Sequence, residues 1–284
     1  MLFKDLGFSF GDKIVNEIVS GQPVVLIYGE QGCGKTTMMS QIPDCLFFTL
    51  EGKTGCNKSN YVQVDSYNEL LNDMRELYIK LKDVKEKPIK AIVIDTLTKL
   101  NTFIVKQVLI EAKEADKRSD MPKDINDSSF PSLTFGKGIS RQKSAFINFM
   151  DACKKIAELG IRVHITAHTV NKVSKADSLG GGGVMRADVD INDNIFNIIA
   201  NDTDIICMLD IKEQTQTIAQ GVQKVIRAER ILRIENEGCR YRKSSFYDEN
   251  VLKTIDPKAY PLGTMDTMYK KFDELLIERI RLIK

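Results

Sequence analysis

The stretch that decides the fold is Gly29-Glu30-Gln31-Gly32-Cys33-Gly34-Lys35-Thr36, which fits the pattern G-x-x-x-x-G-K-[ST] and is followed by Thr37. It comes directly after PVVLIY, an apolar run that reads as a buried strand, and a helix should begin at about Lys35. Glycines allow the positive φ angles with which backbone N–H groups surround an anion, and the helix directs its positive end at the same place. In this pattern Lys35 can reach the β- and γ-phosphates of a nucleotide, and the Thr36 hydroxyl can bind Mg²⁺. Strand, loop and helix together predict a nucleoside triphosphate site at residues 29–37.

Two carboxylates lie where a phosphate loop needs further polar groups. Asp95 ends the apolar run AIVI, and Glu51 ends the run CLFFTL. Ligands of parallel sheets bind beyond the carboxyl ends of the strands, so we predict that Asp95 holds the magnesium shell; a helix-capping aspartate is the alternative. Glu51 could polarise the water that attacks the γ-phosphate if its strand neighbours the Asp95 strand. On position alone, an ordinary surface glutamate fits Glu51 equally well.

Strands and helices alternate along the first two-thirds of the chain. Amphipathic spacing predicts helices over 66–82, 97–115 and 139–159, and apolar runs predict strands over 23–28, 45–50, 91–94 and 161–167. Such alternation is typical of a three-layer α/β domain with a mainly parallel sheet. Two later runs, 204–210 and 227–235, are expected to add antiparallel edge strands. Polar segments should form loops over 116–138 and after His168, and we assign residues 1–263 to one core and 264–284 to a C-terminal helix.

The composition is that of a globular protein. Of 284 residues, 43% are hydrophobic and 28% charged, and no apolar run approaches the roughly 18 residues of a membrane span. The net charge of +2 gives no bulk attraction for nucleic acid, so any such binding must be local. Six scattered cysteines form no C-x-x-C pair and only two histidines are present, which argues against a zinc site or a disulfide scaffold. Together with charges at the N-terminus where a signal peptide is apolar, this favours a reducing cytoplasm.

Four segments in order, GEQGCGKTT, LFFTLEG, AIVIDTLTKL and IRVHITAHT, resemble the RecA-type ATPase core. The likeness is stronger to the short RecA-like ATP-binding proteins of bacteriophages, some of which are single-strand annealing recombination proteins. Pro43 after a short first helix and Gly136-Lys137-Gly138 before a long helix add to this resemblance, which covers about Val24 to Phe246. It implies a Mg²⁺-dependent ATPase that acts on single-stranded DNA, forms a homo-oligomeric ring or filament, and works in the bacterial host cytoplasm if phage-encoded.

The resemblance also implies roles for residues of this chain. Glu51 would be the catalytic base, and His168 would sense the γ-phosphate; a strand-end histidine that merely caps the sheet edge is the alternative. The DNA-binding loop would be Val170–Asn194, in which the candidates for phosphate contacts are Lys172, Lys175 and Arg186. The candidates that would reach the nucleotide of a neighbouring subunit are Arg240, Arg242 and Lys243. An edge strand with protective charges would look the same as this last group.

The charge of the expected DNA loop leaves a second function open. Its three basic residues face four aspartates, Asp177, Asp188, Asp190 and Asp193, so the net charge of the loop is −1. A flexible surface insertion explains such a segment equally well. The chain could therefore be a nucleotide-dependent assembly or partner-binding protein with little affinity for DNA.

Overall fold

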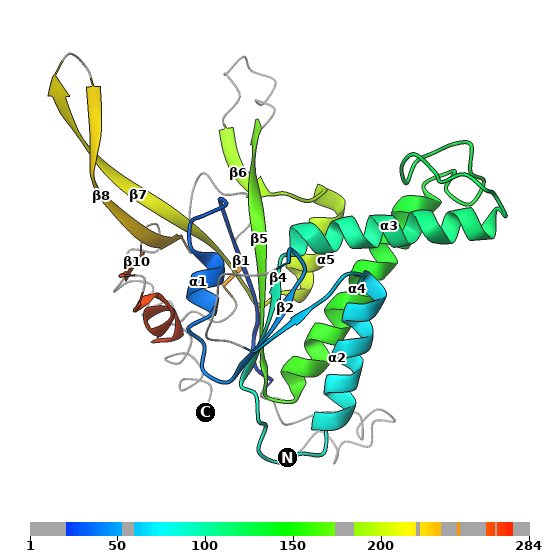
Figure 1. The fold of residues 1–284 in the computed structure, drawn as a ribbon, viewed down its shortest axis with the longest axis horizontal. Coiled ribbons are helices and arrows are strands. Elements are labelled where there is room, and N and C mark those ends of the chain that lie inside the picture. The colour runs from blue at the N-terminus through cyan, green and yellow to red at the C-terminus, as the bar shows by residue number, and fades with distance from the viewer. Residues whose placement is uncertain are drawn as a thin grey trace, which may run out of the picture.

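The computed structural model describes residues 21–52, 60–173, 185–219, 222–233, 243–244, 260–264 and 266–274. In this part of the chain, a mixed sheet runs through the centre and helices cover both of its faces (Figure 1). The strands are β1 Val24–Gly29, β2 Cys45–Thr49, β3 Asn60–Gln63, β4 Ala91–Asp95, β5 Arg162–Val173, β6 Met185–Val189, β7 Ile205–Ala219, β8 Val222–Arg233, β9 Lys243–Ser244 and β10 Tyr260–Gly263. The helices are α1 Lys35–Met39, α2 Tyr67–Leu81, α3 Leu97–Ala115, α4 Lys137–Glu158 and α5 Asp193–Asp202, and a short helix covers 268–274. The predicted three-layer α/β fold is confirmed.

The order of the strands sets the positions of the predicted site residues. Neighbours follow the order β10-β8-β7-β1-β5-β4-β2-β3, with β6 beside β5 and β9 beside β7. The strands from β7 to β3 in this order pair in parallel, whereas β6, β8, β9 and β10 pair antiparallel, as expected for added edge strands. Thr49 at the end of β2 lies opposite Asp95, and Gly29 at the end of β1 lies opposite His168. The strand that leads to Glu51 therefore does neighbour the Asp95 strand.

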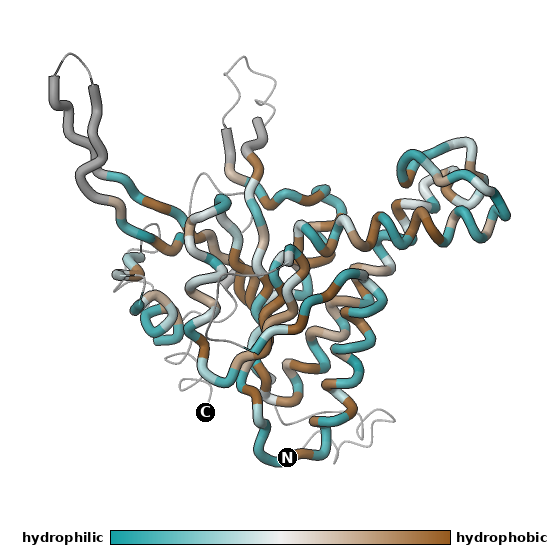
Figure 2. The backbone as a smooth tube through the Cα atoms, in the orientation of Figure 1, coloured by the Kyte–Doolittle hydropathy of each residue, from teal (hydrophilic) through white to brown (hydrophobic). Residues whose placement is uncertain are grey.

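Side chains of β1 alternate between two hydrophobic cores. Val24, Leu26 and Tyr28 pack in the cluster beneath α2, α3, α4 and α5, whereas Val25 and Ile27 pack beneath α1 and the 268–274 helix. All five are at most 2% exposed. Because helices cover both faces of the sheet, the central strands read as continuous apolar runs, and Figure 2 shows them as the hydrophobic centre of the molecule.

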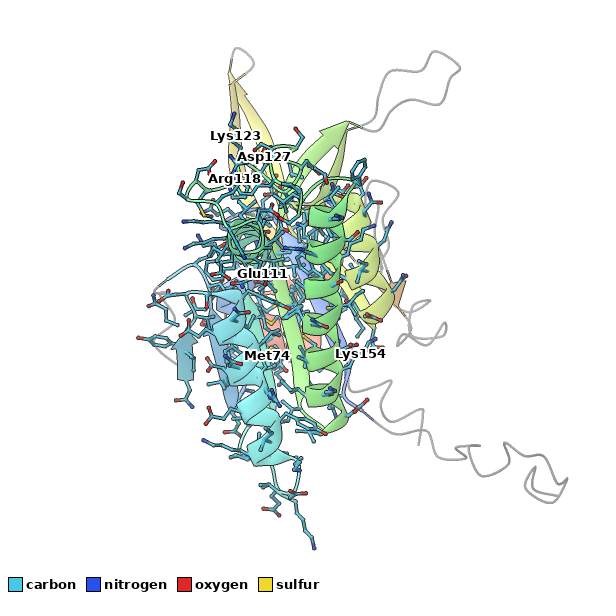
Figure 3. All side chains as sticks on the ribbon, turned by 90° about the vertical axis from the view of Figure 1, so that its right-hand side faces the viewer. Met74, Glu111, Arg118, Lys123, Asp127 and Lys154 are labelled. Atoms are coloured by element: carbon cyan, nitrogen blue, oxygen red, sulfur yellow. The ribbon has the colours of Figure 1, made fainter. Side chains whose placement is uncertain are left out.

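Local signals explain where the long helices begin. Ser66 caps α2, because its side chain accepts a hydrogen bond from the Glu69 N–H at 3.2 Å, and Thr96 caps α3 in the same way. Helices α2 and α4 lie side by side, with buried Met74 on α2 (Figure 3). The bounds predicted for α3 agree with the structure at both ends. None of the helices in the described ranges is long and apolar enough to cross a bilayer.

The expectation of a loop directly after His168 is wrong. Strand β5 continues to Val173 and pairs antiparallel with β6, so that Lys172 lies opposite Arg186, and α5 begins at Asp193. The expected strands at 204–210 and 227–235 are likewise longer, because β7 and β8 form a ribbon that extends beyond the core (Figure 1). Both hairpins mix polar and apolar residues where they leave the core, so no continuous apolar run marks the full length of their strands in the sequence.

The segment Gly136-Lys137-Gly138 begins a helix and is not a separate turn. Gly136, with φ 75°, precedes the first helical residue of α4, which is Lys137. A Cβ atom at Gly138 would lie 1.9 Å from the Ile125 carbonyl oxygen, so the glycine lets α4 pack closely against the segment that follows α3.

The polar segment between α3 and α4 is held by its own contacts. Phe130 and Leu133 are buried within it, and the Arg118 guanidinium lies 4.4 Å from the centroid of the Phe130 ring. Figure 3 shows Arg118, Lys123 and Asp127 gathered there, at the far end of α3. Because apolar and stacked side chains fix it, this long connection is a compact unit of the surface.

Several expectations fall outside the described residues. These are Lys175, Gly180–Gly183, Arg240, Arg242 and the part of the C-terminal helix after residue 274. Of Lys172, Arg186 and Lys243 the structure describes the backbone only. The division of the chain at residue 263 stays a prediction.

Candidate active site

The predicted phosphate loop joins the end of β1 to α1. Gly32 and Gly34 have φ angles of 81° and 106°, which are the positive values that the glycine pattern predicts. The Lys35 ammonium donates to the carbonyl oxygens of Gly29 and Glu30, both at 2.8 Å, and the residue is 4% exposed. A Cβ atom at Gly29 would lie 2.3 Å from the Leu209 carbonyl oxygen, so the loop begins where only glycine fits. The backbone therefore curls around the Lys35 ammonium at the carboxyl end of β1.

Thr36 and Asp95 meet across this site. The Thr36 hydroxyl donates to Asp95 Oδ2 at 2.8 Å, and the Thr166 hydroxyl on β5 donates to Asp95 Oδ1. Asp95 is 5% exposed, at the end of β4, and the peptide bond between Asp95 and Thr96 is cis. A hydroxyl and a carboxylate are hard oxygen donors of the kind that Mg²⁺ takes together with substrate phosphates and water. The donor set at Thr36 and Asp95 therefore fits the predicted magnesium position.

Glu51 lies beside His168 on the same side of the loop. Glu51 Oε1 accepts a hydrogen bond from the Thr96 hydroxyl at 2.7 Å and lies 3.1 Å from His168 Nε2. The backbone N–H of His168 donates to the Thr98 hydroxyl at 3.1 Å, which fixes the end of β5 against the start of α3. The Glu51 side chain is 41% exposed, so a water molecule can approach it. A carboxylate held by two polar neighbours and open to solvent is suited to accept a proton from water.

These groups line one cavity of about 270 Å³. It is bounded by Gln31, Gly32, Gly34, Lys35, Thr36, Thr37, Glu51, Asp95, Thr96 and His168. The structure thus brings Lys35, Thr36, Asp95, Glu51 and His168 together at the carboxyl ends of β1, β2, β4 and β5. Of the predicted loop residues, Gly29, Glu30 and Cys33 are not among those that line the cavity.

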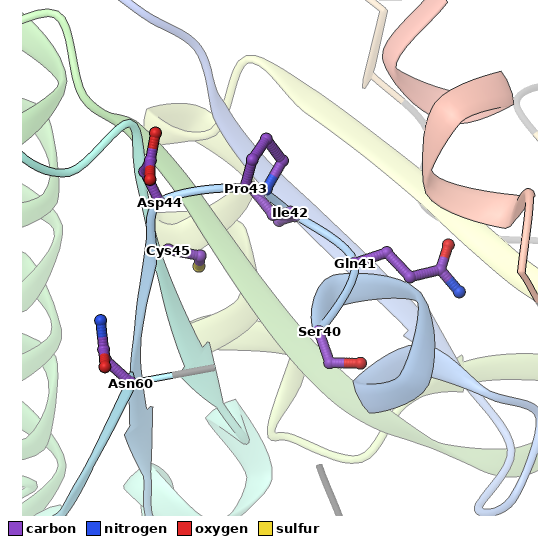
Figure 4. Close-up of a pocket in the computed structure, with 7 residues that line it drawn as sticks. All are labelled: Ser40, Gln41, Ile42, Pro43, Asp44, Cys45 and Asn60. Atoms are coloured by element: carbon purple, nitrogen blue, oxygen red, sulfur yellow. The ribbon is translucent and has the colours of Figure 1, made fainter. Parts of the chain in front are cut away.

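Another hollow, of about 470 Å³, lies next to the segment between α1 and β2 (Figure 4). Its walls are Ser40, Gln41, Ile42, Pro43, Asp44, Cys45 and Asn60, and it lies at the amino-terminal ends of β2 and β3. Asp44 is the one charged residue among these, so its walls offer an anion no cation. Of these two cavities, only the one lined by Lys35 therefore has a cationic side chain that could bind a phosphate.

Among the candidates for contacts with DNA and with a neighbouring subunit, the structure describes the backbone of Lys172, Arg186 and Lys243, and these positions lie away from the cavity. Lys172 and Arg186 belong to the β5–β6 hairpin, beyond the strand end that His168 marks. Lys243 pairs with Ile206, which lies opposite Leu26 in the middle of β1, well before the phosphate loop. The roles assigned to these residues stay predictions.

Four polar residues of the site were missed in the sequence. Thr96 and Thr166 hold the two carboxylates, Thr98 holds His168, and Arg230 on β8 donates from Nε to the Cys33 carbonyl oxygen at 3.0 Å. A signal existed for the threonines, because Thr96 follows Asp95 directly and Thr166 precedes His168 by two, on the same face of β5. None existed for Arg230, which comes 197 positions after its partner.

The cysteine of the phosphate loop is buried and is expected to be unreactive. Cys33 is 2% exposed, and burial raises the pKa of its thiol, although the nearby Lys35 ammonium opposes this shift. A buried thiol with a raised pKa carries little thiolate near neutral pH and is a poor nucleophile. Cys33 therefore serves as a small apolar residue that packs under the loop.

Comparison with known proteins gives the family. A family described as AAA domain matches residues 22–245, which include the loop, both carboxylates and all the central strands. No curated protein matches the sequence. The match extends over well more than half of the chain, and the cavity has the phosphate loop and acidic strand ends of a P-loop nucleotide-binding protein. The chain therefore belongs to the AAA domain family of P-loop ATPases.

Proposed function

We propose that this protein is a RecA-like, Mg²⁺-dependent ATPase that acts on single-stranded DNA in recombination, annealing or replication of the phage type. In this proposal it works as a homo-oligomer in the cytoplasm. The family supports nucleotide binding and ATPase activity in general, whereas the DNA substrate rests on the resemblance of four motifs to RecA-type proteins.

The proposed reaction is an attack of water on the γ-phosphate of ATP, which breaks the bond between the γ-phosphorus and the bridging oxygen of the β-phosphate and releases ADP and phosphate. Backbone N–H groups of the loop over residues 29–36 and the Lys35 ammonium would bind the β- and γ-phosphates, and Thr36 and Asp95 would hold the magnesium shell. Bound Mg²⁺ would neutralise charge that develops on the phosphate oxygens. Glu51 takes a proton from the attacking water, and its orientation is supported by the hydrogen bond from Thr96 Oγ1 at 2.7 Å.

One observation carries the link to DNA: Glu51 Oε1 lies 3.1 Å from His168 Nε2. His168 is the last β5 residue opposite β1, and five residues later the strand ends, within the hairpin that includes Lys172 and Arg186. A change of the Glu51 environment when the γ-phosphate binds or leaves would therefore reach the base of this hairpin directly. In many nucleotide-binding proteins a segment becomes ordered when the γ-phosphate is bound and is released after hydrolysis.

The test compares the rate of ATP hydrolysis with and without single-stranded DNA in the wild type and in Glu51→Gln. General-base catalysis typically contributes about 10²–10⁴-fold, so we expect the variant to lose at least about 100-fold in kcat. Glu158→Gln, an exposed glutamate at the end of α4, is the matched control and should hydrolyse ATP at the wild-type rate. Equal rates for wild type and Glu51→Gln would remove Glu51 from this role.

The second candidate is a nucleotide-dependent assembly or partner-binding protein with little affinity for DNA. The net charge of −1 over the basic and acidic residues of the 170–194 segment favours it. Titration of labelled single strands at low and moderate salt, with and without Mg-ATP, separates the two, because true phosphate contacts weaken steeply with salt. Tighter binding with Mg-ATP supports the DNA function, whereas equal and weak binding in both conditions supports the assembly function.

A further inference from the structure

Arg230 contacts the phosphate loop but is not among the residues that line the cavity. It lies on β8 opposite Ile211 of β7, two strands away from β1, and its Nε donates to the Cys33 carbonyl oxygen at 3.0 Å. The same side chain lies against Gly34, where an added Cβ atom would come within 3.0 Å of Nε and 3.5 Å of Cδ. The Arg230 guanidinium therefore contacts the phosphate loop and donates a hydrogen bond to one of its backbone carbonyl groups.

The chemistry of a peptide unit gives this contact a consequence. The Cys33 carbonyl and the Gly34 N–H belong to one planar trans peptide, so they point in opposite directions. Arg230 lies on the carbonyl side, and the N–H therefore points away from Arg230. Gly34 lines the cavity that also contains Lys35, Thr36, Glu51 and Asp95. A hydrogen bond to a cationic donor is stronger than a neutral one and further polarises the peptide.

We propose that Arg230 is a positioning residue for the nucleotide: it holds the Cys33–Gly34 peptide so that the Gly34 N–H is directed at the bound phosphates. Arg230 does not touch the phosphates in this role. Without this contact, the glycine peptide could rotate, and nucleotide binding would have to supply the free energy that orders it. Because Arg230 already holds the peptide in the orientation that an anion needs, this ordering costs less. The proposal rests on nucleotide binding by the loop alone, and it holds or fails independently of hydrolysis and of single-stranded DNA.

Three substitutions at position 230 separate the donor from the bulk of the side chain. In Arg230→Gln, the amide Nε2 takes the place of the arginine Nε after three carbon atoms, so a neutral donor is kept. In Arg230→Met, a methyl group takes this place and the donor is lost. In Arg230→Lys, the charge is kept but the nitrogen is displaced by one bond. Arg233→Met is the matched control, because it removes an equal charge from the same strand, where Arg233 pairs with Asp210 at 2.7 Å.

The measurement is the dissociation constant of Mg-ADP by calorimetric titration of the full chain, with the thermal midpoint of each variant recorded beside it. We expect Arg230→Met to bind about tenfold more weakly and Arg230→Gln about threefold more weakly, in line with charged and neutral hydrogen bonds. Arg230→Lys should fall between the wild type and Arg230→Met. Arg233→Met should change the affinity by less than about twofold, since it leaves the Cys33 carbonyl contact in place.

A second readout follows the peptide itself. In protein labelled with ¹⁵N-glycine, the Gly34 amide resonance should shift on addition of Mg-ADP in the wild type and shift less in Arg230→Met. Wild-type affinity in Arg230→Met would overturn the proposal, as would equal losses in Arg230→Met and Arg233→Met, which would assign the effect to net charge. Equal losses in Arg230→Gln and Arg230→Met would also overturn it, because the donor at this position would then have no role.

Discussion

Replacement of His164 should remove a large part of the acid sensitivity of this fold. His164 lies in the middle of β5, fully buried, between the rings of Tyr269 and Phe272 at centroid distances of 6.3 and 6.2 Å. Neither ring nitrogen has a hydrogen-bond partner among the described residues. Burial, with a smaller contribution from Arg162, lowers the pKa of His164 to about 3. The histidine is therefore neutral in the folded protein at every pH at which the fold is usually handled.

The sign of the effect follows from proton binding. Between pH 6.5 and 3 the unfolded chain binds a proton at this histidine and the folded chain does not, so the free energy of unfolding falls as the pH falls through this range. With a pKa of about 6.5 in the unfolded state, the loss between pH 7.5 and pH 5 is about 2 kcal/mol. The full contribution is present above the unfolded pKa.

The experiment measures urea unfolding by circular dichroism at pH 7.5 and pH 5 for the wild type and His164→Leu. Leucine has a similar volume and no ionisable group, so the difference in unfolding free energy between variant and wild type should rise by about 2 kcal/mol in favour of the variant at pH 5. Because the chain has two histidines, the comparison is repeated in a His168→Leu background, where the same rise is expected. An unchanged difference at the two pH values would refute the reasoning that burial keeps His164 neutral.

Three further outcomes are expected. Ser66→Ala should lower the free energy of unfolding by about 1 kcal/mol in urea titrations, because the cap of α2 is lost, whereas Ser144→Ala on the exposed side of α4 should change it by less than about 0.5 kcal/mol. Asp95→Asn should raise the Mg²⁺ concentration for half-maximal hydrolysis by about 10–100-fold, since an amide NH2 group replaces one of the two oxygens that accept from Thr36 and Thr166, and the negative charge is lost; an unchanged requirement would contradict the assignment. Cys33 should resist alkylation in the folded protein and react in urea, as measured by mass spectrometry, because its thiol is buried with a raised pKa.

The sequence predicts the central part of this fold well because its signals there are local. A cap at Thr96 and an apolar stripe suffice for the bounds of α3, and apolar runs suffice for β1, β2 and β4, which are buried on both faces. The candidate site was found for the same reason. Glycines, a lysine and strand-end carboxylates appear in fixed order along the chain, and a parallel sheet brings the ends of its strands to one edge.

The parts that the sequence did not predict depend on partners far along the chain. The outer halves of β7 and β8 pair with each other and no longer with the core, and polar residues such as Gln214, Thr215 and Gln216 separate the few apolar ones, so the apolar run that marks a central strand is missing there. The role of Arg230 could not be predicted for the same reason, because its partner, Cys33, lies far away in the sequence. Its position in an alternating strand indicates only an edge residue, and its contact with Cys33 exists because β7 lies between β8 and β1.

The cavity thus has two sides with different chemistry. On one side, Glu51, Thr96 and His168 stand where water can attack, and a change there alters the transition state more than the bound nucleotide. On the other side, Arg230 supports a peptide that would bind the phosphates in the ground state and in the transition state alike. An interaction of this uniform kind changes KM and leaves kcat nearly unchanged, whereas loss of Glu51 should lower kcat. Since β8 carries Arg230 and also forms the ribbon with β7, a partner that bends this ribbon would be expected to alter nucleotide affinity and not the rate of the chemical step.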